Sequence, residues 1–209
     1  MKFPHALNGV LKYYQAMILE IVALVAGLLT GVSYLAFENQ SYGPIVGIVG
    51  IVLFAILSIV SLIFQLKGTK EASIEEHTFK IAFIIIIASI IVQVLSGIFS
   101  SNQIANKIFE IVNNILEIVV LAFVVMGIVK MANRLGHKEM SARGDKMLKL
   151  FLITSLVLVI INIVTGFFIT EGVIYTIISV IELIGLIFNI VLHINYLYYL
   201  RDASEMLQK

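Results

Sequence analysis

The chain has no cysteine among its 209 residues and little charge of either sign. Without cysteine it forms no disulfide, has no thiolate nucleophile, and offers no thiolate to haem or an iron–sulfur cluster. Charged residues make up 13% of the chain, against about 25% in an average soluble domain. The formal net charge of +1 supplies no basic field, so we expect no nucleic-acid partner.

The sequence also lacks the common motifs of enzymes. The patterns HExxH, GxSxG and the P-loop are all absent. The only aspartates, Asp145 and Asp202, fall in segments that we expect outside the membrane. An aspartyl dyad or a multi-aspartate metal site therefore cannot form within the membrane. We expect a protein that is not an enzyme, with no cofactor and no bound metal.

Apolar residues are what the chain has in abundance. Hydrophobic residues make up 60% of it, against about 45 to 50% in soluble domains. Six apolar runs are each long enough, at roughly 20 residues, to cross a bilayer as a helix, and they lack the alternation of strands. We predict an all-α polytopic membrane protein, with one integral membrane domain over residues 1–209. The expected spans are Gln15–Phe37, Pro44–Leu66, Phe79–Phe99, Ile108–Met131, Leu148–Phe168 and Val173–Leu200.

Basic residues are distributed unevenly between the expected loops. Of the 14 Lys and Arg residues, only Lys107 lies outside the N-terminus, the second and fourth connections and the C-terminus. Positive charge in short loops is typical of the cytoplasmic side. We therefore expect a protein integral to the cytoplasmic membrane, with both termini in the cytoplasm.

Three segments of the chain resemble one another. LLTGVSY, VLSGIFS and IVTGFFI place a Thr-Gly or Ser-Gly pair at Gly31, Gly97 and Gly166, and a second alignment places Glu117 over Glu182. Repetition at a nearly fixed spacing indicates a repeated structural unit. We predict three helical hairpins, at about residues 12–70, 78–138 and 146–204, inserted the same way around a central path. The alternative is that the three segments align by chance, because all of them are composed of a few apolar residue types.

Small residues recur at four-residue spacing in the first two expected spans. A face of small side chains lets helix backbones approach closely in lipid. We expect this face to pack the first two spans together or to contact another subunit, in a homo-oligomer or with a partner membrane protein. The expected packing residues are Ala23, Gly27, Gly31, Gly43, Gly47, Gly97 and Gly166.

A polar stripe follows the fourth expected span, where two Glu and two Asn between residues 110 and 117 share one helix face. The sixth span carries a similar stripe. A carboxylate near the bilayer centre costs at least about 2.5 to 3.5 kcal/mol, which makes such residues candidates for function. The residues expected to line a polar path are Glu117, Glu182, Asn113, Asn114, Asn189 and His193.

Each glutamate also has a structural interpretation. A carboxyl group in lipid can be protonated and act only as a hydrogen-bond donor to a neighbouring helix. Glu110 lies three residues from Lys107, so we expect an interfacial ion pair. Glu20 lies near the inner boundary of the first span, where a tilted helix lets its side chain reach water.

Two stretches carry a resemblance to known sequences. GVLKYYQAMILE (residues 9–20) and VMGIVKMANRLGHKEMSARGDKMLKL (residues 125–150) resemble segments of small, uncharacterised bacterial multi-span membrane proteins. The resemblance covers most of the chain. It implies a multi-span membrane protein and no particular activity.

Two functions from different classes fit these patterns. In the first, the protein is a small transporter or channel that handles cations or protons through a polar path between spans 4 and 6. In the second, it is a non-catalytic structural or accessory membrane subunit that assembles with itself or with a partner. Membrane lipid surrounds the protein in both. Space beside the glutamates favours the first function, and a dry contact between spans 4 and 6 favours the second.

Overall fold

The computed structural model describes residues 2–37, 43–167 and 173–208, and all of its regular elements are α-helices. The predicted all-α class is confirmed. Four of the helices, α1 to α4, contain segments that are long and apolar enough to cross a membrane. The six helices are α1 (Pro4–Phe37), α2 (Gly43–Ala72), α3 (His77–Ile98), α4 (Gln103–Leu135), α5 (Lys138–Phe167) and α6 (Val173–Gln208).

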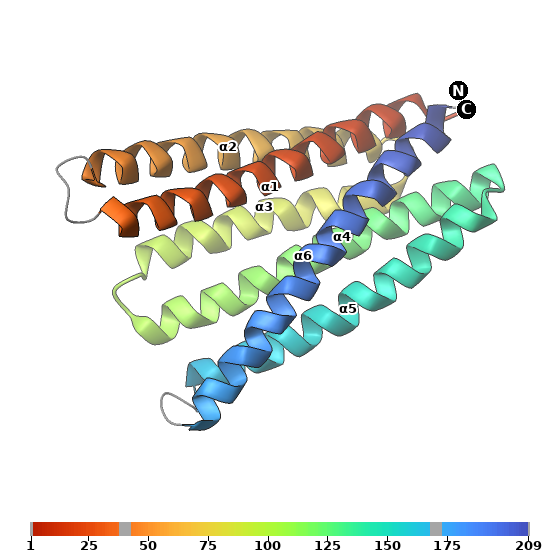
Figure 1. The fold of residues 1–209 in the computed structure, drawn as a ribbon. Coiled ribbons are helices and arrows are strands. Elements are labelled where there is room, and N and C mark those ends of the chain that lie inside the picture. Colours follow the sequence, from red (N-terminus) through yellow and green to blue (C-terminus); the bar gives the residue numbers. More distant parts are fainter. Residues whose placement is uncertain (1, 38–42, 168–172, 209) are drawn as a thin grey trace.

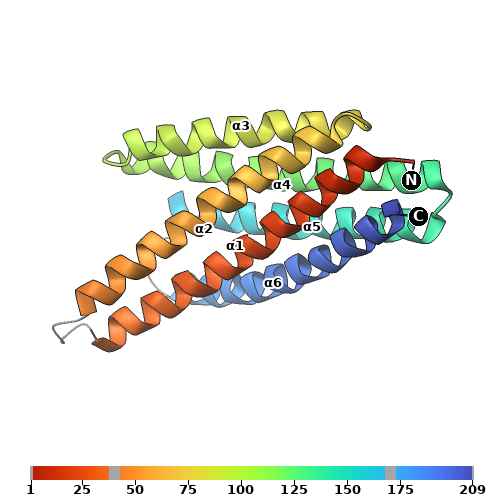
Figure 2. The same cartoon turned by 90° about the horizontal axis from the view of Figure 1, so that it is seen from above.

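The helices run as three antiparallel hairpins, and both chain termini lie at the same end of the bundle (Figures 1 and 2). We call this end the terminal end and the opposite one the far end. Each helix contacts the next one along the chain, and α6 returns to contact α1. The helices therefore form a closed ring in chain order. In this ring α1 and α4 are separated by two helices on either side, and α4 touches α6 only slightly.

Local signals set the ends of α3 and α4. The Glu76 side chain caps α3 by accepting from the backbone N–H of Thr78, and Asn102 caps α4 through the N–H of Ala105. The α4 helix ends at Gly136, whose φ of 75° is the left-handed conformation that glycine adopts without a steric penalty. His137 N–H then donates to the Ala132 carbonyl at 2.9 Å, so α4 turns directly into α5.

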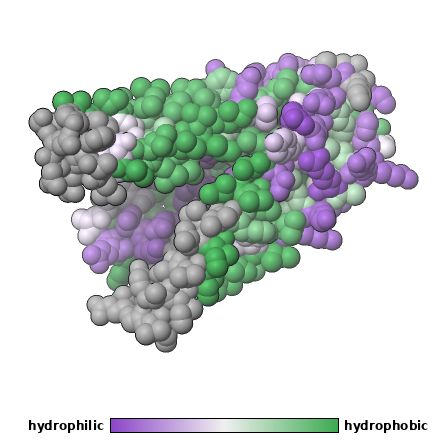
Figure 3. All heavy atoms as spheres, in the orientation of Figure 1, coloured by the Kyte–Doolittle hydropathy of each residue, from purple (hydrophilic) through white to green (hydrophobic). Residues whose placement is uncertain are grey.

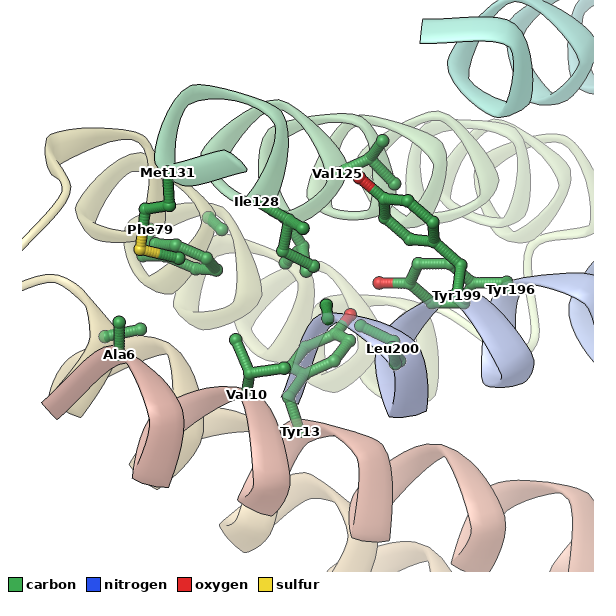
Figure 4. Close-up of a cluster of buried hydrophobic side chains, with 14 of the residues drawn as sticks. Ala6, Val10, Tyr13, Phe79, Val125, Ile128, Met131, Tyr196, Tyr199 and Leu200 are labelled. Atoms are coloured by element: carbon green, nitrogen blue, oxygen red, sulfur yellow. The ribbon is translucent and has the colours of Figure 1, made fainter. Parts of the chain in front are cut away.

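The hydrophobic core is concentrated at the terminal end (Figure 4). Tyr196, Tyr199, Ile128 and Met131 have no exposed side-chain surface, and Phe79 has 1%. Among the described side chains, burial extends from the terminal end only as far as Ala23, Ser61, Ser89, Val120, Phe151 and Leu192, with Gly50 as an exception. The far halves of the helices are therefore less tightly packed against one another.

The surface of the bundle divides by polarity (Figure 3). Apolar side chains cover the middle of the bundle and much of its far part, where Leu28 and Val32 are 62% and 66% exposed, although a hydrophilic patch lies near the far end below the α1–α2 pair. Hydrophilic residues gather at the terminal end. The same view shows the molecule hollowed between the α1–α2 pair and the helices below it, towards the far end. A wide apolar surface with a polar end suits a helix bundle in lipid.

Helices α1 and α2 approach each other backbone to backbone at Gly9 and Gly68. A Cβ atom on Gly9 would lie 2.5 Å from the Gly68 carbonyl oxygen, and one on Gly68 would lie 2.6 Å from the Gly9 carbonyl oxygen. Each glycine thus leaves room for the backbone of the other helix. Close backbone approach is the role expected of small residues in membrane helices, but these two glycines were not predicted to have it.

The predicted packing residues behave differently from one another. Ala23 is buried, and Gly27 faces the ring of Phe54. Gly31 and Gly97 have open space around the position of a Cβ, so neither glycine contacts another helix among the described residues. Gly47 is half-buried. Two others, Gly43 and Gly166, lie outside the residues whose surroundings the structure describes.

The Tyr199 hydroxyl is buried against Gly144 and has no hydrogen-bond partner among the described residues. A buried hydroxyl without a partner costs the free energy of its lost hydration. We expect Tyr199→Phe to raise the free energy of unfolding by about 1 kcal/mol. Thermal unfolding in a maltoside detergent measures the effect, and a loss of stability would show that the hydroxyl is bonded.

Candidate functional site

A cavity of about 450 Å³ lies inside the ring, where α1, α2, α3, α4 and α6 all contribute to its wall. It begins where the core ends, since Tyr13 and Ile86 belong to both. The α1 wall consists of Tyr13, Met17 and Glu20, at steps of four and three residues. This spacing places all three side chains on one face of the helix.

Two carboxylates face this cavity from opposite sides of the ring. Glu20 comes from α1 and Glu117 from α4, and both side chains are accessible rather than packed against a helix. Neither has an ion-pair partner among the described residues, so the cavity attracts positive charge.

An amide network linking α3 and α4 holds Glu117. Asn113, one helical turn before it, donates from Nδ2 to a Glu117 carboxylate oxygen at 2.7 Å. The Asn113 carbonyl oxygen accepts from the Ser89 hydroxyl at 2.8 Å and from Gln93 Nε2 at 3.3 Å. Because Asn113 is bonded on both sides, the network fixes the orientation of the Glu117 side chain.

A second network links α1 and α2 beside Glu20. Gln65 Nε2 donates to the Glu20 carboxylate at 3.2 Å. The same nitrogen lies 3.5 Å from the hydroxyl oxygen of Ser61, and that hydroxyl donates to the Ala16 carbonyl at 2.9 Å. Ser61 is buried, so this contact ties α2 to α1 at the depth of the cavity.

Aromatic rings close the cavity towards the core. His193 lines the cavity, and its ring meets Phe151 edge to face with centroids 5.6 Å apart. Phe151 in turn meets Tyr196, which meets Tyr13 at 6.5 Å. Such edge-to-face contacts stabilise aromatic clusters. The cluster joins α1, α5 and α6 beside the cavity.

The structure brings some of the predicted site residues together. Glu117 and His193 both line the cavity, and Asn113 supports Glu117. Asn114 is half-buried and does not belong to the described lining. The side chains of Glu182 and Asn189 lie outside the described residues. Glu110 pairs with Lys107 at 3.2 Å, which confirms the predicted ion pair between these two residues.

The residues that α1, α2 and α3 contribute to this site were not predicted from the sequence. We expected Glu20 to reach water at the inner boundary, but it faces the cavity opposite Glu117. Its partner Gln65, and Gln93 and Ser89 on α3, were not singled out. The available signal was the isolated polarity of Glu20 and Gln93 in otherwise apolar runs, the same signal that identified Glu117.

Comparison with known proteins finds no match. No family model fits the chain, and no curated protein and no solved structure is similar to it. The resemblance to small bacterial multi-span proteins stays a prediction.

The site has the chemistry of a binding cavity. No group of three or more His, Asp or Glu side chains within the described part of the chain is arranged to hold a metal ion. The cavity instead combines two carboxylates with amides, hydroxyls and apolar side chains. Such a site can hold a cation or exchange a proton.

Proposed function

We propose that this protein is a small membrane transporter or channel for cations or protons. The observation that carries this proposal is the cavity in which Glu20 and Glu117 face each other from opposite sides of the helix ring. A carboxylate at membrane depth is costly, and it normally marks an ion or proton pathway or a bound partner.

The cavity favours transport over a purely structural role for Glu117. A carboxyl group that only joins two helices is expected to lie in the contact between them. Glu117 receives one hydrogen bond from its own helix and is otherwise accessible to the cavity. Glu20 likewise has one neutral partner, Gln65. Both carboxylates retain lone pairs for an incoming cation.

The proposed protein has six spans, arranged as three repeats of a hairpin, with both termini cytoplasmic. The three antiparallel hairpins and the shared position of the termini are consistent with this arrangement (Figure 1). Basic residues at the terminal end, among them Lys12, Lys130 and Arg143, support a cytoplasmic location for that end.

Two facing carboxylates suggest how transport is coupled to protons. When both are charged they repel each other, and either a proton or a cation relieves the repulsion. A cation that binds between them therefore displaces a proton. Movement of the bound ion towards the cytoplasm requires the aromatic cluster of Tyr13, Phe151, His193 and Tyr196 to part.

Flux through reconstituted protein tests the proposal. Liposomes that contain Na⁺ or K⁺, or that hold a proton gradient, should lose the ion or the gradient when the protein is present. Glu117→Gln should lower the rate by at least about tenfold, because the amide keeps the shape but cannot carry the charge. Glu110→Gln is the matched control, since Glu110 lies on the same helix and pairs with Lys107. If folded wild-type protein moves none of these ions, the proposal fails.

An accessory or structural subunit is the second candidate. Gly31 and Gly97 leave open positions on α1 and α3, and exposed small residues allow another helix to approach. In this case the protein forms a stable complex with itself or a partner and carries no flux. Crosslinking in native membranes from cysteines placed at both glycines distinguishes this candidate from the first.

A further inference from the structure

The size of the cavity indicates a ligand larger than a metal ion. Its volume is about 450 Å³, whereas a single water takes up roughly 30 Å³ in the liquid. Sites for small organic molecules fall at about 300 to 1,000 Å³. A bare cation would fill only a small fraction of this space.

The lining suits a molecule that has an apolar body. Met17, Phe54, Leu62, Ile86 and Val120 contribute to the wall beside the two carboxylates. Hard metal ions require about six or more oxygen ligands arranged around them, and apolar side chains cannot supply these. Aliphatic and aromatic side chains instead gain free energy by covering the hydrocarbon part of a ligand.

Several polar groups of the described lining can accept hydrogen bonds. The Nε2 groups of Gln65 and Gln93 donate to Glu20 and Asn113, which leaves the amide oxygens to accept. The hydroxyls of Ser61 and Ser89 likewise donate within the protein. Together with the two carboxylates, these oxygens call for a ligand that donates hydrogen bonds and carries positive charge. A primary ammonium, with three N–H donors and no acceptor, meets both requirements.

We propose that the cavity between Glu20 and Glu117 binds an organic ammonium ion, with its nitrogen between the carboxylates and its hydrocarbon body against the apolar wall. This inference rests on the proposed function and specifies the class of its substrate.

Fluorescence anisotropy of 2-(1-naphthyl)ethylammonium provides the test. The chain has no tryptophan, so tyrosine emission is the protein background to the naphthyl emission. Full-length protein in a neutral maltoside detergent should bind this probe at least about tenfold more tightly than the uncharged 2-(1-naphthyl)ethanol. Glu20→Gln and Glu117→Gln should each weaken binding of the ammonium and leave the alcohol unchanged. Glu110→Gln, which alters a carboxylate outside the described lining, should leave both unchanged.

Two results would overturn the inference. Equal affinity for ammonium and alcohol would show that the carboxylates do not recognise charge. Absence of probe binding in protein that still moves Na⁺, K⁺ or protons would reject the organic substrate and leave the proposed function intact. Saturable, glutamate-dependent binding supports the inference even if ion flux is absent, in which case only the proposed function fails. Circular dichroism of each variant confirms that the helices are folded.

Discussion

Replacing Gly9 with alanine is expected to destabilise the protein by about 2 to 3 kcal/mol. The added methyl group would lie 2.5 Å from the Gly68 carbonyl oxygen, 2.6 Å from the Ala72 nitrogen and 2.7 Å from the Ala72 Cβ. Two of these three atoms belong to the backbone of α2, which cannot move aside as a side chain can. Helices α1 and α2 must therefore separate where Gly9 and Gly68 meet.

Helix propensity alone predicts the opposite effect of Gly9→Ala on stability. Alanine is favoured over glycine within a helix by about 1 kcal/mol. At an open position, a change from glycine to alanine should therefore leave the stability of the protein unchanged or raise it. Gly31→Ala is the matched control on the same helix, because a Cβ there meets no atom within 4 Å. Gly97→Ala provides the same control on α3.

Unfolding by denaturing detergent measures all three variants. We expect Gly9→Ala to unfold at a lower fraction of denaturant than the wild type, and the two controls to unfold at the same fraction or a higher one. If Gly9→Ala is as stable as Gly31→Ala, the close approach of α1 and α2 at Gly9 and Gly68 is refuted.

Glu76→Ala is expected to lower the free energy of unfolding by about 2 to 3 kcal/mol. Glu76 is 3% exposed and begins α3. Its carboxylate accepts from the Thr78 hydroxyl at 3.1 Å, lies 2.6 Å from Arg134 Nη2, and lies 3.4 Å from Lys130 Nζ. One side chain thus caps α3 and joins it to the last turns of α4.

Several separate contributions make up this magnitude. Loss of a helix cap costs about 1 kcal/mol, and a hydrogen bond to a charged group contributes about 1.5 to 3 kcal/mol. Lys130 and Arg134 are about half exposed, so water solvates them when Glu76 is gone, and the ion-pair contribution is correspondingly reduced. The sum therefore stays well below the cost of an isolated buried charge.

Two further variants separate the cap from the charge. Glu76→Gln keeps an oxygen that can accept from Thr78 but loses the ion pairs, so it should recover part of the lost stability. Glu110→Ala removes an exposed ion pair with Lys107 and should cost less than about 0.5 kcal/mol. Equal losses for Glu76→Ala and Glu110→Ala in thermal unfolding would contradict the assigned role of Glu76.

The helical class follows directly from composition and hydropathy, but the ends of the helices do not. We expected the first span to begin at Gln15, whereas α1 begins at Pro4. Hydropathy detects the part of a helix that suits lipid, and the helix continues past that part where it packs on other helices. Ala6 and Val10 are buried in the core at the terminal end, so helix packing determines where α1 starts.

The site was predictable only in part, for a related reason. The polar stripe of α4 is visible in the sequence because Asn113 and Glu117 lie one turn apart. What faces that stripe depends on which helices are neighbours in the ring, and spacing along one helix carries no such information. Glu20 and Gln65 reach the cavity because α1 and α2 close the ring on the side opposite α4.

The glycines illustrate the same limit. Regular four-residue spacing drew attention to Gly27 and Gly31, yet the close backbone contact between α1 and α2 uses Gly9 and Gly68, a single glycine from each helix. A lone glycine gives no periodic signal. Its importance depends on the backbone that crosses it, which is a property of the folded bundle.

The uneven burial of the bundle has a consequence for how it moves. Separating the helices at the terminal end breaks the core, the Gly9–Gly68 contact and the Glu76 ion pairs together, whereas few of the described side chains are buried towards the far end. The deformation that costs the least free energy is therefore a pivoting of the helices about the terminal end. Separation of the helices is then expected to begin at the far end and to reach the core at the terminal end last.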